Sequence, residues 1–398
     1  MRVKRTFKQR LLKDLQVTLL AAGLMAFFVL IATSIKPLNP MKRALENFSF
    51  TDIYYEILRD SGDPDTSRVI TIVDLTRLTN RTDIANTLRD IEAAGPKVVG
   101  VDCCFDNEGE DLDGNYAITS VAEDYDNIVW ALKMLDHSGN DSIGWTKEIH
   151  SFFAYFVDIT EGTVNMPRTL YDPTKRTLPI SERFQGVDKP SIAVQVANAY
   201  AGKDVTYGRT GDIKINFSPT VFRVLQPEEV PKHPELISDQ IVMFGAMYED
   251  ADTHWVPGGK IAGVELLAYS IQTLIYGNEF KTLSKPLYWI ISFLLVLLAQ
   301  IVVGYFVDWT WNSENIILKF LVGSTYTINM LLAVVSVVFV YIGFRVFAYY
   351  NISFNMAWVL SVIAFLGTAR LMHTSIINYK KAKARKREEK QAAAINQQ

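Results

Sequence analysis

Four long apolar stretches constrain the fold of this chain more than any other feature. The first, residues 17–35, contains nineteen residues and no charge, and about twenty such residues cross the apolar core of a bilayer as a helix. Comparable stretches return at residues 286–307, 325–344 and 352–372. The pattern predicts four transmembrane helices and excludes a wholly water-soluble protein.

Basic residues beside these stretches predict their orientation, because cytoplasmic segments next to spans are enriched in Lys and Arg. Residues 1–13 carry six basic residues and no acidic one, and residues 377–398 carry seven basic residues against two acidic ones. Both ends, residues 1–16 and 373–398, are therefore expected in the cytoplasm. Four spans then place the long intervening segment, residues 36–285, on the outer side of the membrane.

The first apolar stretch has an alternative role as a cleaved signal peptide. After the basic start, Ala32 and Ser34 form a small-x-small pattern of the kind that is cleaved. The apolar core of a signal peptide usually has about 7–15 residues, and this stretch is longer, which favours an anchor that is kept. Residues 36–285 lie outside in either case.

The charge distribution argues against one class of partner. The whole chain has a net charge of −3, while the two tails alone contribute +6 and +5, so residues 14–376 carry −14. An acidic body repels a phosphate backbone. We therefore expect no nucleic acid partner.

The two cysteines of the chain, Cys103 and Cys104, are neighbours. A disulfide usually joins Cα atoms about 4.4–6.8 Å apart, whereas adjacent Cα atoms are about 3.8 Å apart, so a bond between neighbours strains the peptide. We expect both to be reduced, buried packing residues rather than part of a disulfide framework.

The outer segment begins with the pattern of an α/β domain. Residues 68–74 and 97–102 are β-branched runs of strand length, and each ends in a carboxylate. Between them, residues 82–94 place apolar residues at helical spacing, and Thr82 can cap the start of this helix. Strand, helix and strand in this order favour a parallel pair with a right-handed connection.

The same rhythm continues along the segment. Regular elements are predicted as helices at 116–124, 191–201 and 261–276 and as strands at 127–132, 212–217 and 239–245. Residues 136–183 have weak periodicity and are predicted as strands and long loops. The fold class is therefore one extracytoplasmic α/β domain, a mostly parallel sheet with flanking helices, together with four transmembrane helices.

Two carboxylates mark a candidate ligand site. Asp74 and Asp102 end strands that we expect to be neighbours in the sheet, and α/β folds bind ligands at the carboxyl ends of parallel strands. The alternative is that both residues cap loops or helices by accepting backbone N–H groups. Asp252 and His254, in the loop that follows strand 239–245, can project into the same region.

The sequence gives little support for catalysis or a cofactor. No Gly-x-Ser-x-Gly elbow, Walker loop, Gly-x-Gly-x-x-Gly or Cys-x-x-Cys pattern is present. His254 has no second histidine at ligand spacing, so we expect a solvated loop residue, no metal site and no cofactor. A hydrolase that uses Asp74, Asp102 and Asp252 is the remaining catalytic hypothesis, and the expectation is that the chain is not an enzyme.

Polar residues inside the spans give little support for transport. Gln300 is the clearest polar group in a predicted span. Transport paths place several polar or broken segments near the membrane midplane, whereas a single Gln more often joins two helices by a hydrogen bond. We expect the second role.

Several motifs occur in an order that resembles a known family. They are VITIVD with Asp74, Arg81 before the first helix, AAGPKVVGVDCCF with Gly95, Asp102 and Phe105, INFSPTVF, and a closing DQIVMFG…GVELLAYS segment with Gly245, Asp252, Pro257, Gly263, Val264 and Glu265. Together with three spans after the last helix, they resemble the type 2 CHASE family over most of residues 45–372. The resemblance implies an extracytoplasmic sensory domain of generally unknown ligand, with Asp74, Arg81, Asp102, Asp252 and Glu265 as candidate ligand-binding residues.

The chain departs from the family pattern at two points. Leu267 stands where a histidine often follows the Gly-Val-Glu run, so a ligand role of that histidine does not carry over. About thirty residues follow Ala369, and they resemble no kinase, cyclase or phosphatase. A separate output protein is therefore expected.

The leading hypothesis is a receptor subunit of a bacterial inner (plasma) membrane, with its domain in the periplasm. It binds an unknown ligand or protein there and signals to a cytoplasmic protein through the basic tail, for which membrane lipid is the competing partner. A homodimer is left open. The alternative is a scaffold or assembly component of an envelope protein complex.

Overall fold

The computed structural model describes residues 6–34, 54–55, 65–166, 174–218, 220–317 and 325–395. The chain forms two compact units, one of Thr51–Phe280 and one of Met1–Phe50 with Lys281–Gln398. Arg2, Lys4 and Arg5 of the basic N-terminus lie outside the described residues, as do the last three residues of the tail and most of residues 36–64.

One large sheet organises the unit Thr51–Phe280. Its order within the described residues is β10-β1-β11-β2-β3-β4-β7-β8, and β5 also pairs with β3. The strands are β1 Asp65–Asp74, β2 Val98–Val101, β3 Ile128–His137, β4 Trp145–Ile149, β5 Thr160–Thr163, β7 Ser181–Phe184, β8 Val187–Pro190, β10 Thr220–Leu225 and β11 Ile241–Gly245. Strands β10, β1, β11, β2, β3 and β5 pair in parallel.

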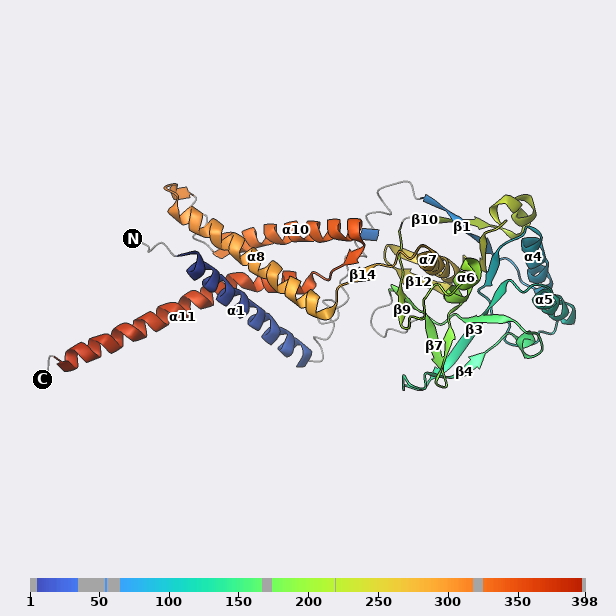
Figure 1. The fold of residues 1–398 in the computed structure, drawn as a ribbon, viewed down its shortest axis with the longest axis horizontal. Coiled ribbons are helices and arrows are strands. Elements are labelled where there is room, and N and C mark those ends of the chain that lie inside the picture. Colours follow the sequence, from blue (N-terminus) through green and yellow to red (C-terminus); the bar gives the residue numbers. More distant parts are fainter. Residues whose placement is uncertain are drawn as a thin grey trace. The chain divides into compact units, whose positions relative to one another are not determined.

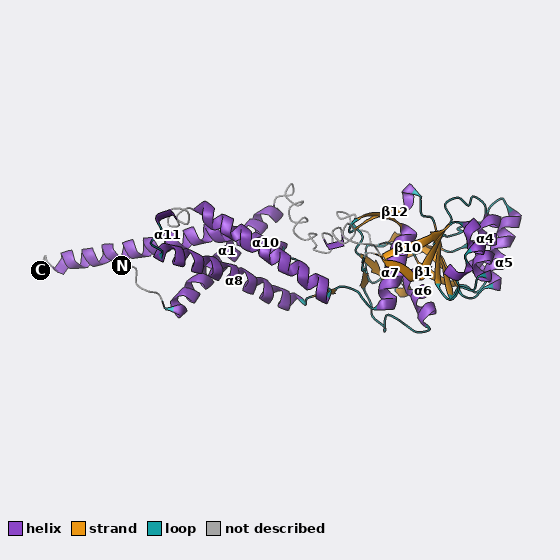
Figure 2. Ribbon diagram, turned by 90° about the horizontal axis from the view of Figure 1, so that it is seen from above, coloured by secondary structure: helices purple, strands orange, loops and turns teal. Residues whose placement is uncertain are grey.

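Helices cover both faces of the parallel part. Helices α4 (Arg81–Ala93) and α5 (Leu112–Asp124) lie on one face, and α6 (Ile192–Ala201) and α7 (Gly263–Tyr276) lie on the other (Figures 1 and 2). The predicted fold class, a mostly parallel sheet with flanking helices, is confirmed for this unit.

Successive side chains of the buried strands point to opposite faces of the sheet, so each strand contributes to the apolar core on both faces. Val99 and Val101 of β2 pack with Leu88 of α4 in one apolar cluster. Gly100, between them, faces α6, where an added Cβ would lie 2.7 Å from the sulfur of Met243 and 2.9 Å from Val196. Glycine is needed here because interiors are close-packed and leave no room for a methyl group.

An aromatic group fills the core beside the first residues of β3. The ring centroids of Trp130 and Phe153 are 4.9 Å apart in an edge-to-face contact, and Phe105 lies 6.1 Å from each. Phe153 belongs to a short helix, η2 (Phe152–Tyr155). This helix lies in the region where the sequence predicted only strands and loops, and its aromatic residues anchor it.

Several element boundaries differ from the sequence predictions. Asn80 rather than Thr82 caps α4, because its side chain accepts a 2.8 Å hydrogen bond from the backbone N–H of Asp83. Helix α5 starts at Leu112, four residues early, because the side chain of Asp111 accepts from the backbone N–H of Gly114. Local capping chemistry therefore decided both starts.

Two strands also differ from the predictions in length. Strand β9 is shorter than predicted (Asp212–Lys214) and pairs with β6 (Thr177–Pro179) outside the main sheet. Strand β3 is longer and changes partner along its length. Residues 129–132 pair with β5 in parallel, and residues 133–137 pair with β4 in the antiparallel sense. The sheet therefore divides at this point.

The second unit contains four long apolar helices. They are α1 Phe7–Ser34, α8 Lys285–Asn312, α10 Thr325–Tyr350 and α11 Ala357–Ile395, and each is long and apolar enough to cross a membrane. Two helices start elsewhere than the predicted spans. Helix α1 begins ten residues earlier, and α11 begins five residues later because β15 (Ile352–Ser353) first pairs with β14 (Lys281–Thr282).

Small residues let these helices approach one another. Ala21 of α1, Ala299 of α8 and Ala369 of α11 are fully buried in a shared apolar cluster. At Gly367 of α11 an added Cβ would collide with the side-chain amide of Asn329 of α10. Close approach through small residues is the usual basis of helix packing in a membrane, where lipid is as apolar as the side chains.

Candidate functional site

The carboxyl edge of the parallel sheet places Asp74 at the end of β1 and Asp102 just after β2. The prediction that these two strands are neighbours is wrong, because β11 lies between them and pairs Asp74 with Gly245 and Val101 with Phe244. Paired strands lie about 4.8 Å apart, so the backbones of β1 and β2 are roughly 10 Å apart here. Strand β11 arrives some 140 residues later in the chain, and local patterns do not encode such an insertion.

Asp74 is 1% exposed and is held by the loops around it. Its carboxylate accepts hydrogen bonds from the backbone N–H of Thr76 (3.0 Å), the backbone N–H of Met247 (3.1 Å) and the side-chain amide of Gln226 (3.2 Å). Burial by itself would raise the pKa of Asp74, but the hydrogen bond that the Thr76 hydroxyl donates to this carboxylate, together with the three bonds above, outweighs burial and lowers the pKa. The contacts are those expected of a residue that joins three loops, and its ligand role stays a prediction.

Asp102 and Asp252 do come together. Asp252 ends a short helix, η5 (Asp250–Asp252), and His254 follows in β12 (Thr253–Val256). Burial, reinforced by the negative charge of Asp252, raises the pKa of Asp102 to about 7, and His254 acts in the opposite direction. His254 Nε2 lies 3.5 Å from Asp252 Oδ1, so His254 is paired with a carboxylate rather than only solvated.

Two glycines make this approach feasible. An added Cβ at Gly263, the first residue of α7, would collide with the Asp252 carboxylate. An added Cβ at Gly245 would lie 2.7 Å from Val264 and 3.2 Å from the Cβ of Asp102. The carboxylate therefore lies at a helix N-terminus, where unpaired N–H groups and the helix dipole favour an anion. Gly245, Asp252, Gly263 and Val264 belong to the closing motif of the sequence, and close packing explains why they occur together.

Arg81 is held elsewhere. Its guanidinium donates to the side-chain oxygen of Asn115 and, at 2.6 Å, to the carbonyl of Asn107. It also lies over the rings of Phe152 and Phe105, with 5.1 Å and 5.7 Å to the centroids. Among the described residues no carboxylate forms an ion pair with it. Arg81 thus fixes the acidic loop after β2 and does not join the Asp102–Asp252 pair.

Glu265 lines a cavity of about 360 Å³ between α7 and strands β1 and β10. It lies in the first turn of α7, two residues after Gly263. Apart from Glu265, the walls are mostly aromatic and aliphatic, with three hydroxyl groups and one thioether: Tyr55, Ile72, Phe217, Thr220, Val221, Phe222, Val224, Met247, Val256, Pro257, Ile261 and Tyr269. The volume is within the range of about 300–1,000 Å³ that is usual for small-molecule sites.

The comparison with protein families agrees with these features. The model of the CHASE2 domain matches residues 22–306 of the chain, well over half of its length. The chain belongs to the CHASE2 domain family. The match starts and ends earlier than the 45–372 range of the predicted resemblance. Comparisons with curated proteins and with solved structures found no match.

CHASE2 is a family of extracellular sensory domains. With four helices that can cross a membrane in the described part of the chain, the protein is a membrane sensor of this family. The Asp102–Asp252 pair, Glu265 and the cavity all lie within the matched CHASE2 residues. The candidate residues therefore belong to the part of the chain that the family model matches.

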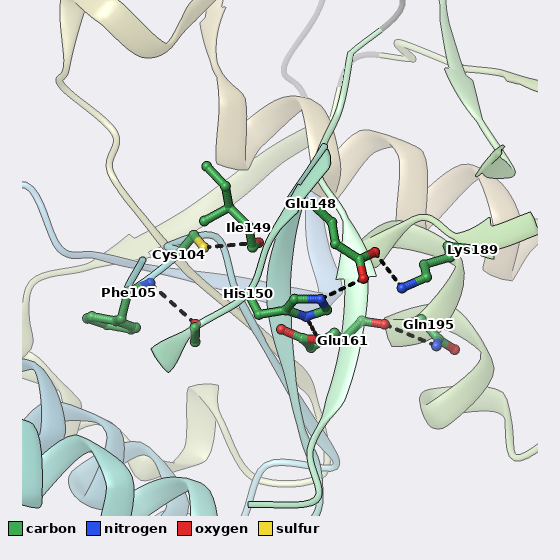
Figure 3. Close-up of polar contacts among 9 residues, drawn as sticks. Cys104, Phe105, Glu148, Ile149, His150, Glu161, Lys189 and Gln195 are labelled. Atoms are coloured by element: carbon green, nitrogen blue, oxygen red, sulfur yellow. Dashed lines mark hydrogen bonds and ion pairs between the residues drawn. The ribbon is translucent and has the colours of Figure 1, made fainter. Parts of the chain in front are cut away.

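The CHASE2 domain holds a second polar cluster that the sequence analysis missed. His150 lies just after β4, with Nε2 2.9 Å from Oε1 of Glu148 and Nδ1 2.6 Å from Oε2 of Glu161 (Figure 3). Lys189 of β8 lies 2.5 Å from the other oxygen of Glu148. Glu148 and His150 are two residues apart, a spacing that places side chains on one face of an extended backbone, and this spacing was the one available signal. Glu161 and Lys189 come from distant strands.

Charges in this cluster depend on one another. Burial lowers the pKa of His150, but the two glutamates raise it more strongly, so the net pKa lies above the ordinary value. Burial raises the pKa of Glu161 in spite of His150, while Lys189 and His150 outweigh burial and lower the pKa of Glu148. Both ring nitrogens face a carboxylate, so the imidazole must be protonated to donate to both. The ring of Tyr155 also faces it, at 5.9 Å.

The two cysteines of the CHASE2 domain are free, as expected. They are half-buried rather than fully buried, because both lie in the loop after β2 and not in a core element. Burial raises the pKa of Cys103 to about 12 and that of Cys104 to about 11. Thiols with such pKa values are poor nucleophiles at neutral pH.

In the membrane unit, Gln300 of α8 has a partner that the sequence analysis did not identify. Its side-chain amide donates a 2.8 Å hydrogen bond to Asp14 of α1, and both side chains are buried. Asp14 was expected in the tail before the first span, but α1 begins at Phe7 and includes it. The expected role of Gln300 in joining two helices is thus confirmed.

Proposed function

We propose that this protein is the receptor subunit of a bacterial signalling system. Its CHASE2 domain detects a cue in the periplasm, and its transmembrane helices pass the change to a separate cytoplasmic protein. The observation that carries the proposal is the position of α7. This helix starts at the Asp102–Asp252 pair and lines the cavity with Glu265, and eight residues lie between its end and the start of α8. A change at the site therefore acts on a helix that is joined to a span by a short connection.

The form of α11 supports a cytoplasmic output. The helix continues without interruption from the predicted span to Ile395, and residues 380–389 are exposed. Six of its seven basic tail residues lie in this exposed part. A continuous helix transmits rotation or translation better than a flexible linker. We propose that both termini are cytoplasmic and that the tail contacts an acidic face of the output protein.

A non-catalytic role is part of the proposal. A hydrolase would need Asp74, Asp102 and Asp252 in one constellation, but the Asp74 carboxylate is taken up by loop amides, and β11 separates its strand from β2, which Asp102 follows. The raised pKa of Asp102 suits a proton-sharing pair of carboxylates, which structural pairs also show. Sensing by a change in these contacts needs no reaction.

Crosslinking in intact cells tests the proposed output. Proteins captured through an N-terminal tag are compared between the full chain and a chain that ends after Tyr379. A third variant replaces the seven basic tail residues with Gln and keeps the length of the helix. We expect a signalling protein that the full chain captures and both variants lose. The double variant Glu388→Gln, Glu389→Gln serves as the matched control and should capture it normally.

Two results would contradict the proposal. If the same proteins are captured with and without the tail, and they are periplasmic or envelope proteins, the scaffold alternative is supported. If truncation only weakens binding to vesicles of anionic phosphatidylglycerol, the tail is a lipid anchor. A crosslink between two copies of the chain would identify a homodimer as the signalling form.

A further inference from the structure

Four aromatic rings line the cavity beside Glu265 and touch one another in a row. The ring centroids of Tyr55 and Phe217 are 5.9 Å apart, those of Phe217 and Tyr269 are 5.4 Å apart, and those of Tyr269 and Phe222 are 4.8 Å apart. The Tyr55–Phe217 and Tyr269–Phe222 contacts are edge-to-face. Such a row presents both ring faces and ring edges to its surroundings.

Hydrogen bonds fix the two tyrosines of this row. The hydroxyl of Tyr269 donates to the carbonyl of Thr220 at 2.7 Å, and the hydroxyl of Tyr55 donates to the side-chain oxygen of Asn216 at 3.0 Å. Ring orientation is therefore set before any ligand arrives. A preorganised wall loses little conformational entropy on binding.

The one charged side chain among the described residues that line the cavity is acidic. Glu265 is one helical turn before Tyr269 on α7, and none of the described residues that line the cavity is basic. Glu265 also interacts within the chain, but a carboxylate has about four acceptor positions and can serve more than one partner. An anionic ligand is disfavoured beside this carboxylate, whereas a cation can share it with its partner in the chain.

We propose that this cavity binds an organic cation, an alkylammonium or quaternary ammonium group on a small apolar body. Aromatic ring faces attract such cations. An organic cation is weakly hydrated, so it suits apolar walls better than a small metal ion, which is strongly hydrated. The proposal names the chemical class of the cue and so rests on the proposed sensory function. The cation would sit between the rings and Glu265, next to the start of α7.

Titration calorimetry on the full chain tests this directly. The protein is kept in a maltoside detergent, which carries no amine, and is titrated with choline and with 3,3-dimethylbutan-1-ol. The alcohol has the same shape, but carbon replaces the charged nitrogen. We expect choline to bind and the alcohol to bind about tenfold more weakly or not at all. Equal affinities, or no heat from choline at millimolar concentration, would overturn the proposal.

Variants separate the charge from the rings. Glu265→Gln should weaken choline binding about tenfold and leave the alcohol unaffected. Glu228→Gln, an exposed glutamate outside the cavity lining, should bind choline like the wild type. Phe222→Leu keeps an apolar wall but removes a ring, so it should weaken choline more than the alcohol. If Glu265→Gln does not fold, this last comparison still decides.

Failure of this proposal can be told apart from failure of the sensory function. The titration needs no output protein, and the chain that ends after Tyr379 should bind choline as the full chain does. Choline binding without any tail-dependent partner would sustain the cavity proposal and contradict the receptor. A tail-dependent partner without cation binding would support the receptor proposal and contradict the proposal that the cavity binds an organic cation.

Discussion

The Nδ1 atom of His150 lies 2.6 Å from Oε2 of Glu161, and this contact joins the end of β4 to β5 at the point where the sheet divides. The side chains are only 20% and 14% exposed. Strand β3 gives each of these two strands half of its length, so no backbone ladder joins β4 to β5 directly. A protonated imidazole between two carboxylates does so instead.

This contact predicts a pH dependence of stability. The folded-state pKa of His150 is above its ordinary value of about 6.5, so its contribution is complete below that pH and is lost as pH rises through the raised pKa. We expect the melting temperature of the full chain to fall over this range, by the equivalent of about 1–2 kcal/mol. His150→Gln should remove that part of the fall in a pH series of melting curves.

His233 supplies the matched control for this series. It pairs with Glu235 but is 47% exposed, and exposed pairs contribute little. His233→Gln should leave the pH dependence unchanged. If both variants lose the pH dependence of the melting temperature equally, the contact of His150 between β4 and β5 is not its cause.

Asp102 and Asp74 should respond oppositely to neutralisation. The pKa of Asp102 rises to about 7 in the folded state, so ionisation costs stability as pH rises from about 3.8 to about 7. Asp102→Asn should therefore stabilise the chain at pH 8, by roughly 2–4 kcal/mol. The pKa of Asp74 is lowered, so its contribution is present above about 3.8 and is lost as pH falls through the lower folded value.

Asp74→Asn should thus destabilise the chain at pH 8, by about 1–3 kcal/mol. An amide NH₂ would replace one carboxylate oxygen and would face the N–H groups that now donate to it. Chemical unfolding at pH 8 and at pH 5 measures both variants, and the gain from Asp102→Asn should shrink at pH 5. A loss of stability in Asp102→Asn at both pH values would show that burial of the Asp102 charge, with its repulsion by Asp252, does not destabilise the folded chain.

The contact between Gly263 and Asp252 predicts a coupled pair of substitutions. Gly263→Ala places a methyl group against the carboxylate and should cost about 1–3 kcal/mol, in the manner of overpacking. Asp252→Ala removes the carboxylate, so the double variant should recover most of that cost. Melting curves of the four chains form a double-mutant cycle. Additive effects would exclude the clash as the cause.

In the membrane unit, Gln300→Leu should destabilise the helices. It removes the donor to Asp14 and leaves a buried carboxylate without that bond, at a cost of about 1–2 kcal/mol. Ser336→Ala is the control, because its hydroxyl bonds only to Leu332 of its own helix. Thermal stability in detergent measures both. A Gln300→Leu chain as stable as Ser336→Ala would mean that Asp14 finds another partner.

Periodicity and propensity predicted most of the secondary structure. The helix at 82–94 and the strands at 68–74 and 97–102 match α4, β1 and β2 within a few residues, because each carries its own apolar pattern and breakers. The errors fall where short-range chemistry competes. Asn80 rather than Thr82 caps α4. Residues Ile352–Ser353 pair with β14, so α11 starts only after them.

The candidate site was only partly predictable. Asp102 and Asp252 were named and do meet, but Arg81 and Asp74 turned out to be held by loops. The His150 cluster was missed because its members come from β4, β5 and β8, and only long-range pairing brings those strands together. A lone polar residue on a strand gives no local sign of its partner.

By itself, the amino-acid sequence determined the four membrane helices, the α/β class of the outer domain and its family, because apolar length, period and motif spacing are local properties of a chain. The tertiary structure alone decided that β11 separates Asp74 from Asp102, that Gln300 meets Asp14, and that Glu265 shares a cavity with four rings. These contacts join residues far apart along the chain. Their partners are selected by packing and hydrogen bonding in three dimensions, which no window of sequence contains.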